Sequence, residues 1–185
     1  ILVCMKNDLT AMRAAVPNMF IIAANEVSQP DVVSPYDAVS SGYEIMNLGA
    51  DAIYSGMSMP CIEAVSKEYI PVIGHVGYVP YRSTWYGGPR AVGKTGLEAK
   101  KVYEMARSYQ DAGAIGVEIE IVPAKVTEEI NRRLENLILI SMGSGTGATV
   151  QYLFATDVLG TNTGHIPRHA KIFGNLHAEE AKLQA

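Results

Sequence analysis

The stretches Leu48-Gly49-Ala50-Asp51-Ala52-Ile53 and Ala112-Gly113-Ala114-Ile115-Gly116-Val117 follow one pattern. In each, a helix is expected to end at the glycine, and a buried strand to begin shortly after it. Such short turns recur in parallel sheets, whose strands are covered on both faces and read as continuous apolar runs. The two stretches therefore predict an α/β fold with a parallel sheet.

The same alternation extends along most of the chain. Strands are predicted at apolar runs in residues 20–24, 52–54, 71–74, 115–121, 137–140 and 150–155. Helices are predicted at residues 36–48, 61–68, 96–112 and 124–134. Ser34 and Thr95 are suitable N-caps, with Pro35 and Glu98 at the positions that favour a helix start. Residues 76–92 are rich in Gly, Pro and Tyr, so a long loop is expected there.

Strand–helix alternation of this kind builds either a (β/α)8 (TIM) barrel or an open doubly wound sheet. Six strands are predicted, whereas a closed barrel needs eight. We therefore expect a (β/α)8 barrel with roughly its first two βα units missing before Phe20. Residues 1–185 are expected to form a single, partial barrel domain.

Composition narrows the classes of function. The chain has 185 residues, of which 48% are hydrophobic and 18% charged, and its net charge is −4. No basic run is present, so neither nucleic acid nor a membrane surface is expected as a partner. The start of the chain lacks the basic flank of a signal peptide, and Cys4 and Cys61 do not make a disulfide framework. A cytoplasmic location is expected.

In a parallel barrel the active site lies at the carboxyl ends of the strands. Polar residues follow the predicted strands at these ends: Asn25 and Glu26, Ser55, His75, Glu120, and the loop from Ser141 to Gly147. Position alone makes these the candidate site residues.

Glu118 and Glu120 lie two apart on one predicted strand, so their side chains point to the same face. Two carboxylates inside a barrel would either bind a cation or raise one pKa, which would make a general base. The alternative is a solvated pair, or a pair that faces Lys and Arg partners on helices.

His75 stands between Gly74 and Gly77, which permit close approach of backbone or ligand. A histidine at a strand end suits binding of a substrate oxygen or proton transfer. The alternative is a structural histidine bonded to a loop carbonyl. The remaining histidines, His165, His169 and His177, lie in a polar tail and are expected to be solvated.

Residues 88–95, Gly-Pro-Arg-Ala-Val-Gly-Lys-Thr, match the P-loop pattern. A P-loop must follow a buried strand directly, and residues 78–87 do not read as one. Pro89 also removes a backbone N–H that would cradle phosphate. We therefore expect no nucleotide here. Tyr78, Tyr81, Trp85 and Tyr86 crowd the preceding segment, where they would line a pocket for a flat cofactor or form a subunit contact.

Several longer runs resemble the ketopantoate hydroxymethyltransferase family. Residues 70–80, IPVIGHVGYVP, are similar to its G-I-P-V-M-G-H-I-G-L-T-P stretch, and residues 92–95, VGKT, to its V-Q-G-[KR]-T. Further similarities lie at residues 12–24, at 117–123 (V-L-E-x-V-P in the family), at 142–145 (I-G-A-G) and at 151–160. The resemblance spans nearly the whole chain, and residues 70–95 are its most specific part.

The resemblance implies a (β/α)8 enzyme of pantothenate biosynthesis, acting as a homo-oligomer. It would transfer a hydroxymethyl group from 5,10-methylenetetrahydrofolate to 3-methyl-2-oxobutanoate, an α-keto acid, through a Mg2+-stabilised enolate. It further implies Glu120 as the catalytic base. From their shared position at strand ends, the catalytic candidate His75, together with Asn25 and Ser55, is expected to converge with Glu120 on one cavity. The metal would be held by Asn25 and Glu26, and the substrate by Ser55, Gly143 and Ser144.

Some positions depart from the family's motifs. Asn25 replaces a metal-binding Asp, and Ile53 and Ser55 align with the Lys and Glu of V-K-L-E-G-G. A V-G-D-S motif with a second metal-binding Asp would lie before residue 1. Two alternatives therefore stand beside the transferase: a catalytically degraded paralogue kept as a binding or assembly subunit, and another carbon–carbon lyase of the phosphoenolpyruvate mutase and isocitrate lyase superfamily.

Overall fold

The computed structural model describes residues 1–24 and 32–183. Its centre is one sheet of seven strands, and each strand pairs in parallel with the next. The strands are β1 (Leu2–Met5), β2 (Ile21–Ala24), β3 (Ala52–Tyr54), β4 (Val72–Gly77), β5 (Gly116–Glu120), β6 (Ile138–Met142) and β7 (Val150–Gln151). Their order follows the chain without reversal, as in a barrel and not as in a doubly wound sheet.

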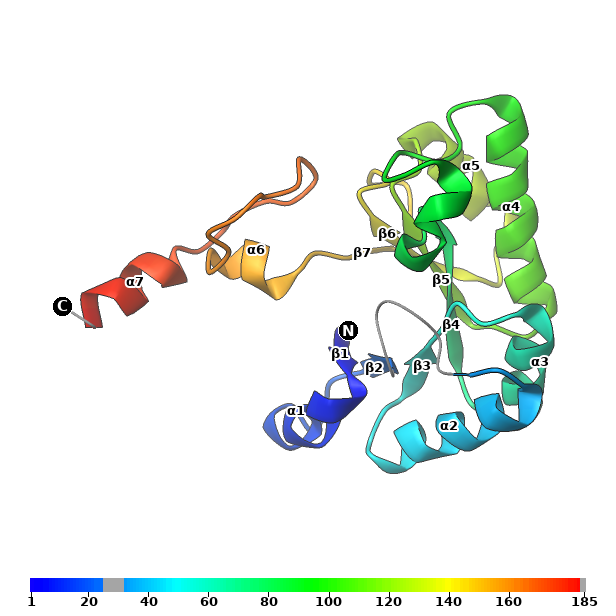
Figure 1. Ribbon diagram of the computed structural model, residues 1–185, viewed down its shortest axis with the longest axis horizontal. Helices are drawn as coiled ribbons and strands as arrows, with labels where there is room; N and C mark the ends of the chain where they lie inside the picture. Colours follow the sequence, from blue (N-terminus) through cyan, green and yellow to red (C-terminus); the bar gives the residue numbers. More distant parts are fainter. Residues whose placement is uncertain (25–31, 184–185) are drawn as a thin grey trace.

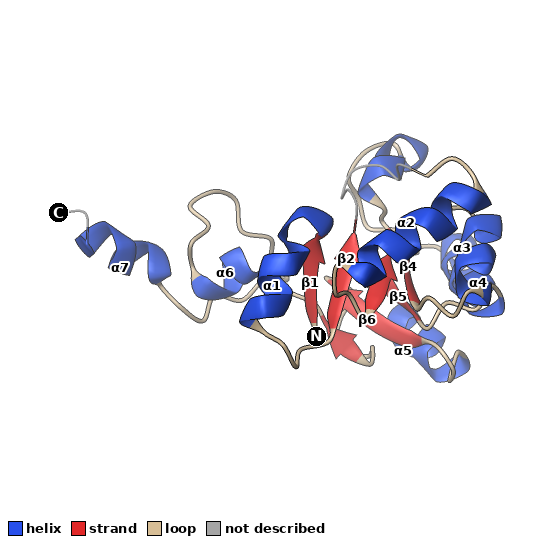
Figure 2. Cartoon of the chain, turned by 90° about the horizontal axis from the view of Figure 1, so that it is seen from below, coloured by secondary structure: helices blue, strands red, loops and turns tan. Residues whose placement is uncertain are grey.

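Helices cover the outer side of the curved sheet (Figures 1 and 2). They are α1 (Leu9–Ala15), α2 (Pro35–Asn47), α3 (Met59–Lys67), α4 (Gly96–Asp111) and α5 (Ala124–Arg133). Two helices follow the last strand, α6 (Ala155–Leu159) and α7 (Leu176–Leu183). The expected partial parallel barrel is confirmed.

The structure corrects three local predictions. Residues 2–15 form β1 and α1, so the unit directly before β2 is present and the sheet has seven strands instead of six. The expected loop at 76–92 begins later, because β4 runs to Gly77 and a 3-10 helix, η2, occupies Pro80–Tyr86. The strand expected at 150–155 is short, because α6 begins at Ala155.

Both predicted N-caps form. The Ser34 hydroxyl accepts a hydrogen bond from the Asp37 N–H, and the Thr95 hydroxyl accepts one from the Glu98 N–H. These bonds satisfy backbone donors that a helix leaves free in its first turn. The starts of α2 and α4 are thus determined by residues adjacent in the sequence.

The strands divide the apolar side chains between two sides. Residues on the outer side, such as Ile53, Val76 and Val117, pack with the helices in one large core. A smaller cluster of Ile22, Ala52, Ile73 and Ile140 lies on the inner side. Because successive side chains of a strand point to opposite faces, this separation settles which residues face the barrel interior.

The sheet stays open between β1 and β7, and a hollow of about 850 Å3 lies between these edges. Beyond β7, the chain with α6 and α7 extends away from the sheet (Figure 1). None of the helices in the described part of the chain has both the length and the hydropathy needed to cross a bilayer.

Candidate active site

Three neighbouring strands bring four polar side chains together inside the open barrel. Tyr54 ends β3, His75 lies on β4, and Glu118 and Glu120 lie on β5. The register pairs His75 with Glu118 and Gly77 with Glu120. These residues therefore lie nearer the carboxyl ends of the strands than the inner apolar layer, in which Ile73 is two residues before His75.

The imidazole of His75 is the centre of this cluster. Its Nδ1 lies 2.6 Å from the Tyr54 Oη, and its Nε2 lies 2.9 Å from the Glu120 Oε2. The Glu118 Oε1 is farther from Nε2, at 3.8 Å. His75, Glu118 and Glu120 are all less than 9% exposed, so their mutual contacts act where water screens them poorly.

Burial alters the titration of the cluster. It raises the pKa of Glu118 to about 7, and the neighbouring Glu120 adds to this rise, while His75 and Tyr54 oppose it. Burial likewise raises the pKa of the Tyr54 phenol, and the charge of Glu118 contributes. Tyr152, just beyond β7, has its pKa raised to about 12, mainly by burial. Both phenols therefore keep their protons at neutral pH.

The cluster offers two kinds of chemistry. His75, Glu118 and Glu120 each present one ligand atom, and these atoms lie within 4.8 Å of one another, close enough to meet at a cation. Alternatively, the imidazole and carboxylates can hold and pass a proton, since a carboxylate beside a histidine is a common acid–base pair.

The sequence-predicted residues do not all meet here. His75 and Glu120 are in direct contact. Ser55 follows β3, and its hydroxyl accepts a hydrogen bond from the Met57 N–H in a local turn. Ile53 packs on the helix side, whereas Tyr54, like Ala52, faces inward. Asn25 and Glu26, the expected metal ligands, lie outside the described residues.

The loop after β6 is tied to the sheet. The Ser144 hydroxyl accepts a hydrogen bond from the Val122 N–H and donates to the Ile119 carbonyl, at 2.9 and 2.8 Å. Ser144 is 1% exposed, so its hydroxyl serves to join the ends of β5 and β6. Gly143 has a positive φ of 63°, and the ring of His169 lies against it. His169, although exposed, is thus in contact with this loop.

The segment that resembles a P-loop is occupied by the protein's own carboxylate. The Glu98 Oε2 accepts hydrogen bonds from the N–H groups of Gly93 and Lys94, at 3.2 and 3.1 Å. Its other oxygen pairs with Arg90 at 2.7 Å. A phosphate would need the same N–H groups, which supports the expectation that no nucleotide binds here.

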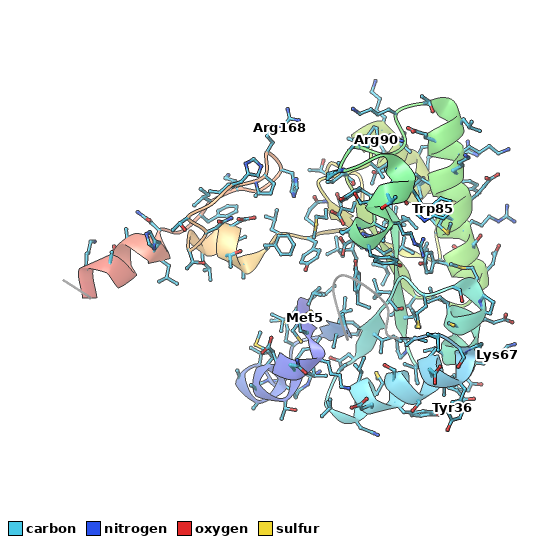
Figure 3. All side chains as sticks on the ribbon, in the orientation of Figure 1. Met5, Tyr36, Lys67, Trp85, Arg90 and Arg168 are labelled. Atoms are coloured by element: carbon cyan, nitrogen blue, oxygen red, sulfur yellow. The ribbon has the colours of Figure 1, made fainter. Side chains whose placement is uncertain are left out.

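Aromatic residues of η2, Trp85 and Tyr86, line a second hollow. A cavity of about 310 Å3 lies between η2 and α4, and its lining includes Arg82, Trp85, Tyr86, Arg90 and Lys101. Figure 3 shows Trp85 and Arg90 in the region of η2 and α4, and Trp85 is 89% exposed. His75 also lines this cavity, so the hollow borders the buried cluster at β4.

Sequence reasoning missed Tyr54 and Tyr152. Both follow from strand parity, since Tyr54 and Tyr152 pack with the inner cluster. The predicted strand 52–54 was correct, but only the residue after it, Ser55, was considered for the site. Once Ala52 is known to face inward, Tyr54 must do so as well.

The chain matches proteins of known family. The family model described as ketopantoate hydroxymethyltransferase matches residues 4–183. 3-Methyl-2-oxobutanoate hydroxymethyltransferase 2 of Aliivibrio fischeri is 31% identical over 177 residues, which are 94% of this chain and 65% of that protein. The corresponding protein of Verminephrobacter eiseniae is 34% identical over 156 residues, 80% of this chain and 52% of that protein. The chain thus spans between half and two thirds of the length of these relatives.

Solved structures of low sequence identity share the fold. A protein of Burkholderia cenocepacia J2315, provisionally described as a lyase/mutase, aligns with a TM-score of 0.55 at 15% identity, over 98% of this chain and 65% of that one. The delta-aminolevulinic acid dehydratase of Toxoplasma gondii ME49 aligns with a TM-score of 0.50 at 13% identity, over 74% and 49%. At these identities the likeness concerns the fold alone.

Proposed function

Because the chain belongs to the ketopantoate hydroxymethyltransferase family, we propose that it carries the proton-abstracting site of such an enzyme. The reaction adds a hydroxymethyl group to C3 of 3-methyl-2-oxobutanoate and yields ketopantoate, a step of pantothenate biosynthesis. The one-carbon unit comes from 5,10-methylenetetrahydrofolate. The observation that carries the proposal is the buried contact between Glu120 and His75 at the carboxyl ends of β4 and β5.

Glu120 is the general base in this proposal. Its carboxylate takes the proton from C3 of the keto acid, and the electron pair of the broken C–H bond moves into the neighbouring carbonyl to give an enolate. Water breaks the two C–N bonds to the methylene carbon of methylenetetrahydrofolate, which leaves tetrahydrofolate and the one-carbon unit as formaldehyde. The enolate carbon bonds to that carbon, and the proton held by Glu120 passes to the alkoxide so formed, which gives the hydroxymethyl group. Position supports Glu120 over Glu118, because Glu120 is the last residue of β5 and lies closer to the open end of the site.

His75 and Glu118 assist this base. His75 contacts the Glu120 Oε2 and leaves the second carboxylate oxygen for the substrate. Glu118, whose pKa burial raises to about 7, is largely protonated at slightly acid pH and so adds little repulsion there. The two carboxylates therefore divide the roles: Glu120 accepts the substrate proton, and Glu118, mostly neutral at that pH, supports it.

The family resemblance also implies Mg2+, and the described cluster does not fit that ion as it is arranged. Mg2+ takes oxygen ligands with near-octahedral geometry and keeps several waters. Here the His75 Nε2 already lies within hydrogen-bond distance of Glu120 and 3.8 Å from Glu118. The imidazole nitrogen thus already contacts a carboxylate oxygen that a cation there would need, and the proposal includes no step at a metal.

The degraded-paralogue alternative rested on Ile53 and Ser55. Ile53 packs among the helices, and the Ser55 hydroxyl bonds within its own turn. The identity of these two residues therefore gives no evidence that the inner face of the barrel has lost its catalytic groups. A lyase of the same superfamily would share the enolate step. Formation of ketopantoate that depends on methylenetetrahydrofolate would separate the transferase from a lyase.

Hydrogen–deuterium exchange at C3 of 3-methyl-2-oxobutanoate tests the base directly, because exchange requires proton abstraction but no folate. We expect the protein to catalyse this exchange in D2O. Proton NMR of the keto acid measures the rate at which the C3 proton signal disappears. Glu120→Gln should lower the rate by about 10²–10⁴-fold, the usual cost of losing a general base. Gln keeps the size of the side chain but cannot accept a proton.

Glu135→Gln is the matched control, since Glu135 is exposed in the turn before β6. Glu135→Gln should catalyse the exchange at the parent rate. Circular dichroism should show that both Glu120→Gln and Glu135→Gln are folded. Exchange that survives in Glu120→Gln would exclude Glu120 as the base. No exchange by the folded parent would favour the binding-subunit alternative.

A further inference from the structure

We propose that Tyr54 is a positioning residue, whose hydroxyl donates to the His75 Nδ1 and thereby keeps the imidazole proton on Nε2, directed at Glu120. The proposal deepens the function above, because it rests on Glu120 being the ionised base. Neither the sequence motifs nor the strand-end rule pointed to this tyrosine.

Both nitrogens of the His75 ring have a partner. The Tyr54 Oη lies 2.6 Å from Nδ1, and the Glu120 Oε2 lies 2.9 Å from Nε2. The tyrosine and imidazole rings also pack together, with centroids 5.6 Å apart and planes inclined by 46°. Three adjacent strands thus contribute one member each to a continuous line of hydrogen bonds, Tyr54 to His75 to Glu120.

The direction of these bonds follows from the chemistry of the groups. A neutral imidazole carries one N–H, and its other nitrogen can only accept. An ionised Glu120 can only accept, so the proton of His75 must be on Nε2. Nδ1 then needs an O–H donor, and the Tyr54 phenol supplies one, because phenols remain protonated at neutral pH.

The surrounding groups favour Glu120 as the acceptor. Glu118 is 0.9 Å farther from Nε2 than Glu120, at 3.8 Å against 2.9 Å, which is beyond hydrogen-bond length. Glu118 also hydrogen bonds with the Tyr54 hydroxyl, and because burial raises the pKa of Glu118 to about 7, its protonated form leaves the phenol proton for His75 at slightly acid pH. Tyr54 therefore acts on the Glu120 carboxylate through His75. It determines which nitrogen holds the proton, and this orients the Glu120 carboxylate for the substrate.

Nitrogen-15 NMR of the imidazole tests the proposal without substrate. In the parent, His75 should show a protonated Nε2 and an unprotonated Nδ1. Tyr54→Phe removes only the hydroxyl, so Nδ1 should become partly protonated and its signal should move. His75→Ala identifies the signals, and the exposed His165, His169 and His177 serve as references within each spectrum.

Tyr43→Phe is the matched control. Tyr43 also bonds to a carboxylate, that of Glu68 at 3.0 Å, but it lies on the exposed face of α2. This variant should leave the His75 signals unchanged. A parent spectrum with the proton on Nδ1 would overturn the proposal, even if Tyr54→Phe did not fold. Unchanged His75 signals in a folded Tyr54→Phe would overturn it as well.

A second readout separates positioning from packing. In the C3 exchange assay, Tyr54→Phe should lower kcat by about 10-fold, less than the loss of the base itself, with little change in KM. A change in KM alone would contradict the positioning role. Failure of the proposed function remains distinguishable, because it would appear as an absence of exchange in the parent while the NMR result still reports the tautomer.

Discussion

Glu118 and Glu120 have the same side chain on the same face of β5, yet their surroundings differ. Glu120 has a hydrogen-bond partner in His75, whereas Glu118 lies deeper, where burial is the main influence on its pKa. A carboxyl group without a close cationic partner is costly to ionise in such a place. Glu118, which lies beside the proposed base, is therefore expected to make the free energy of unfolding depend on pH.

We predict that this dependence can be measured. The folded-state pKa of Glu118 is raised from 4.5 to about 7, so its stabilising contribution is complete below pH 4.5 and is lost as pH rises through 7. Glu118→Gln, which mimics the protonated acid, should have a free energy of unfolding similar to the parent at pH 4.5. At pH 8 it should be the more stable, by a few kcal/mol at most, since one pKa unit corresponds to about 1.4 kcal/mol.

Urea unfolding of both proteins between pH 4.5 and 8 measures this difference. The exposed Glu135→Gln should follow the parent at every pH. A constant difference between parent and Glu118→Gln across the range would show that Glu118 does not titrate as its burial indicates.

At the scale of elements, β4 and α4 pack closely because Gly74 has no side chain. Tyr109 of α4 is fully buried, and its ring lies where a Cβ at Gly74 would stand. His75, the next residue, consequently points to the opposite face, into the barrel. The glycine therefore helps to place the catalytic strand against its helix.

Gly74→Ala should destabilise the fold by about 1–3 kcal/mol, the usual cost of inserting a methyl group into a packed core. Gly96→Ala is a suitable comparison, because a Cβ at Gly96, the first residue of α4, meets nothing within 4 Å. It should be neutral or slightly stabilising. Thermal unfolding measures both, and equal melting temperatures for parent and Gly74→Ala would refute the close-packing argument.

At the scale of the whole molecule, the extension after β7 leaves apolar side chains in solvent. Phe173 is 66% exposed and Ile172 is 49% exposed, and Arg168 lies on the same extension (Figure 3). In the part of the chain that the structure describes, the outer edges of β1 and β7 also have no neighbouring strand. Exposed apolar surface of this kind marks sites of protein association.

We therefore predict a homo-oligomer in which this extension takes part. The double variant Ile172→Ser, Phe173→Ser should shift the protein to a smaller species in sedimentation equilibrium. Leu97→Ser is the control, because Leu97 is 65% exposed but lies on α4. A monomeric parent, or an assembly unaffected by the double variant, would contradict the prediction.

The features that the sequence by itself determined depend on residues close together in the chain. Caps at Ser34 and Thr95, glycine-terminated helices and short apolar runs were enough to predict a parallel α/β fold, and the family resemblance favoured the barrel over a doubly wound sheet. They also placed His75 and Glu120 at strand ends. The first strand, β1, was missed because a four-residue apolar run at the chain start has no periodicity of its own to identify it.

Only the tertiary structure decided which side chains meet. Tyr54 and His75 are 21 residues apart, and His75 and Glu120 are 45 apart, so their contacts depend on the register between β3, β4 and β5. A shift of one residue would turn each side chain to the other face. The register also explains why Tyr54, and not Ser55, faces the site. It likewise places the Ser144 hydroxyl where it joins the ends of β5 and β6. Register is set by how the strands pack against one another and against the helices, which local sequence patterns do not contain.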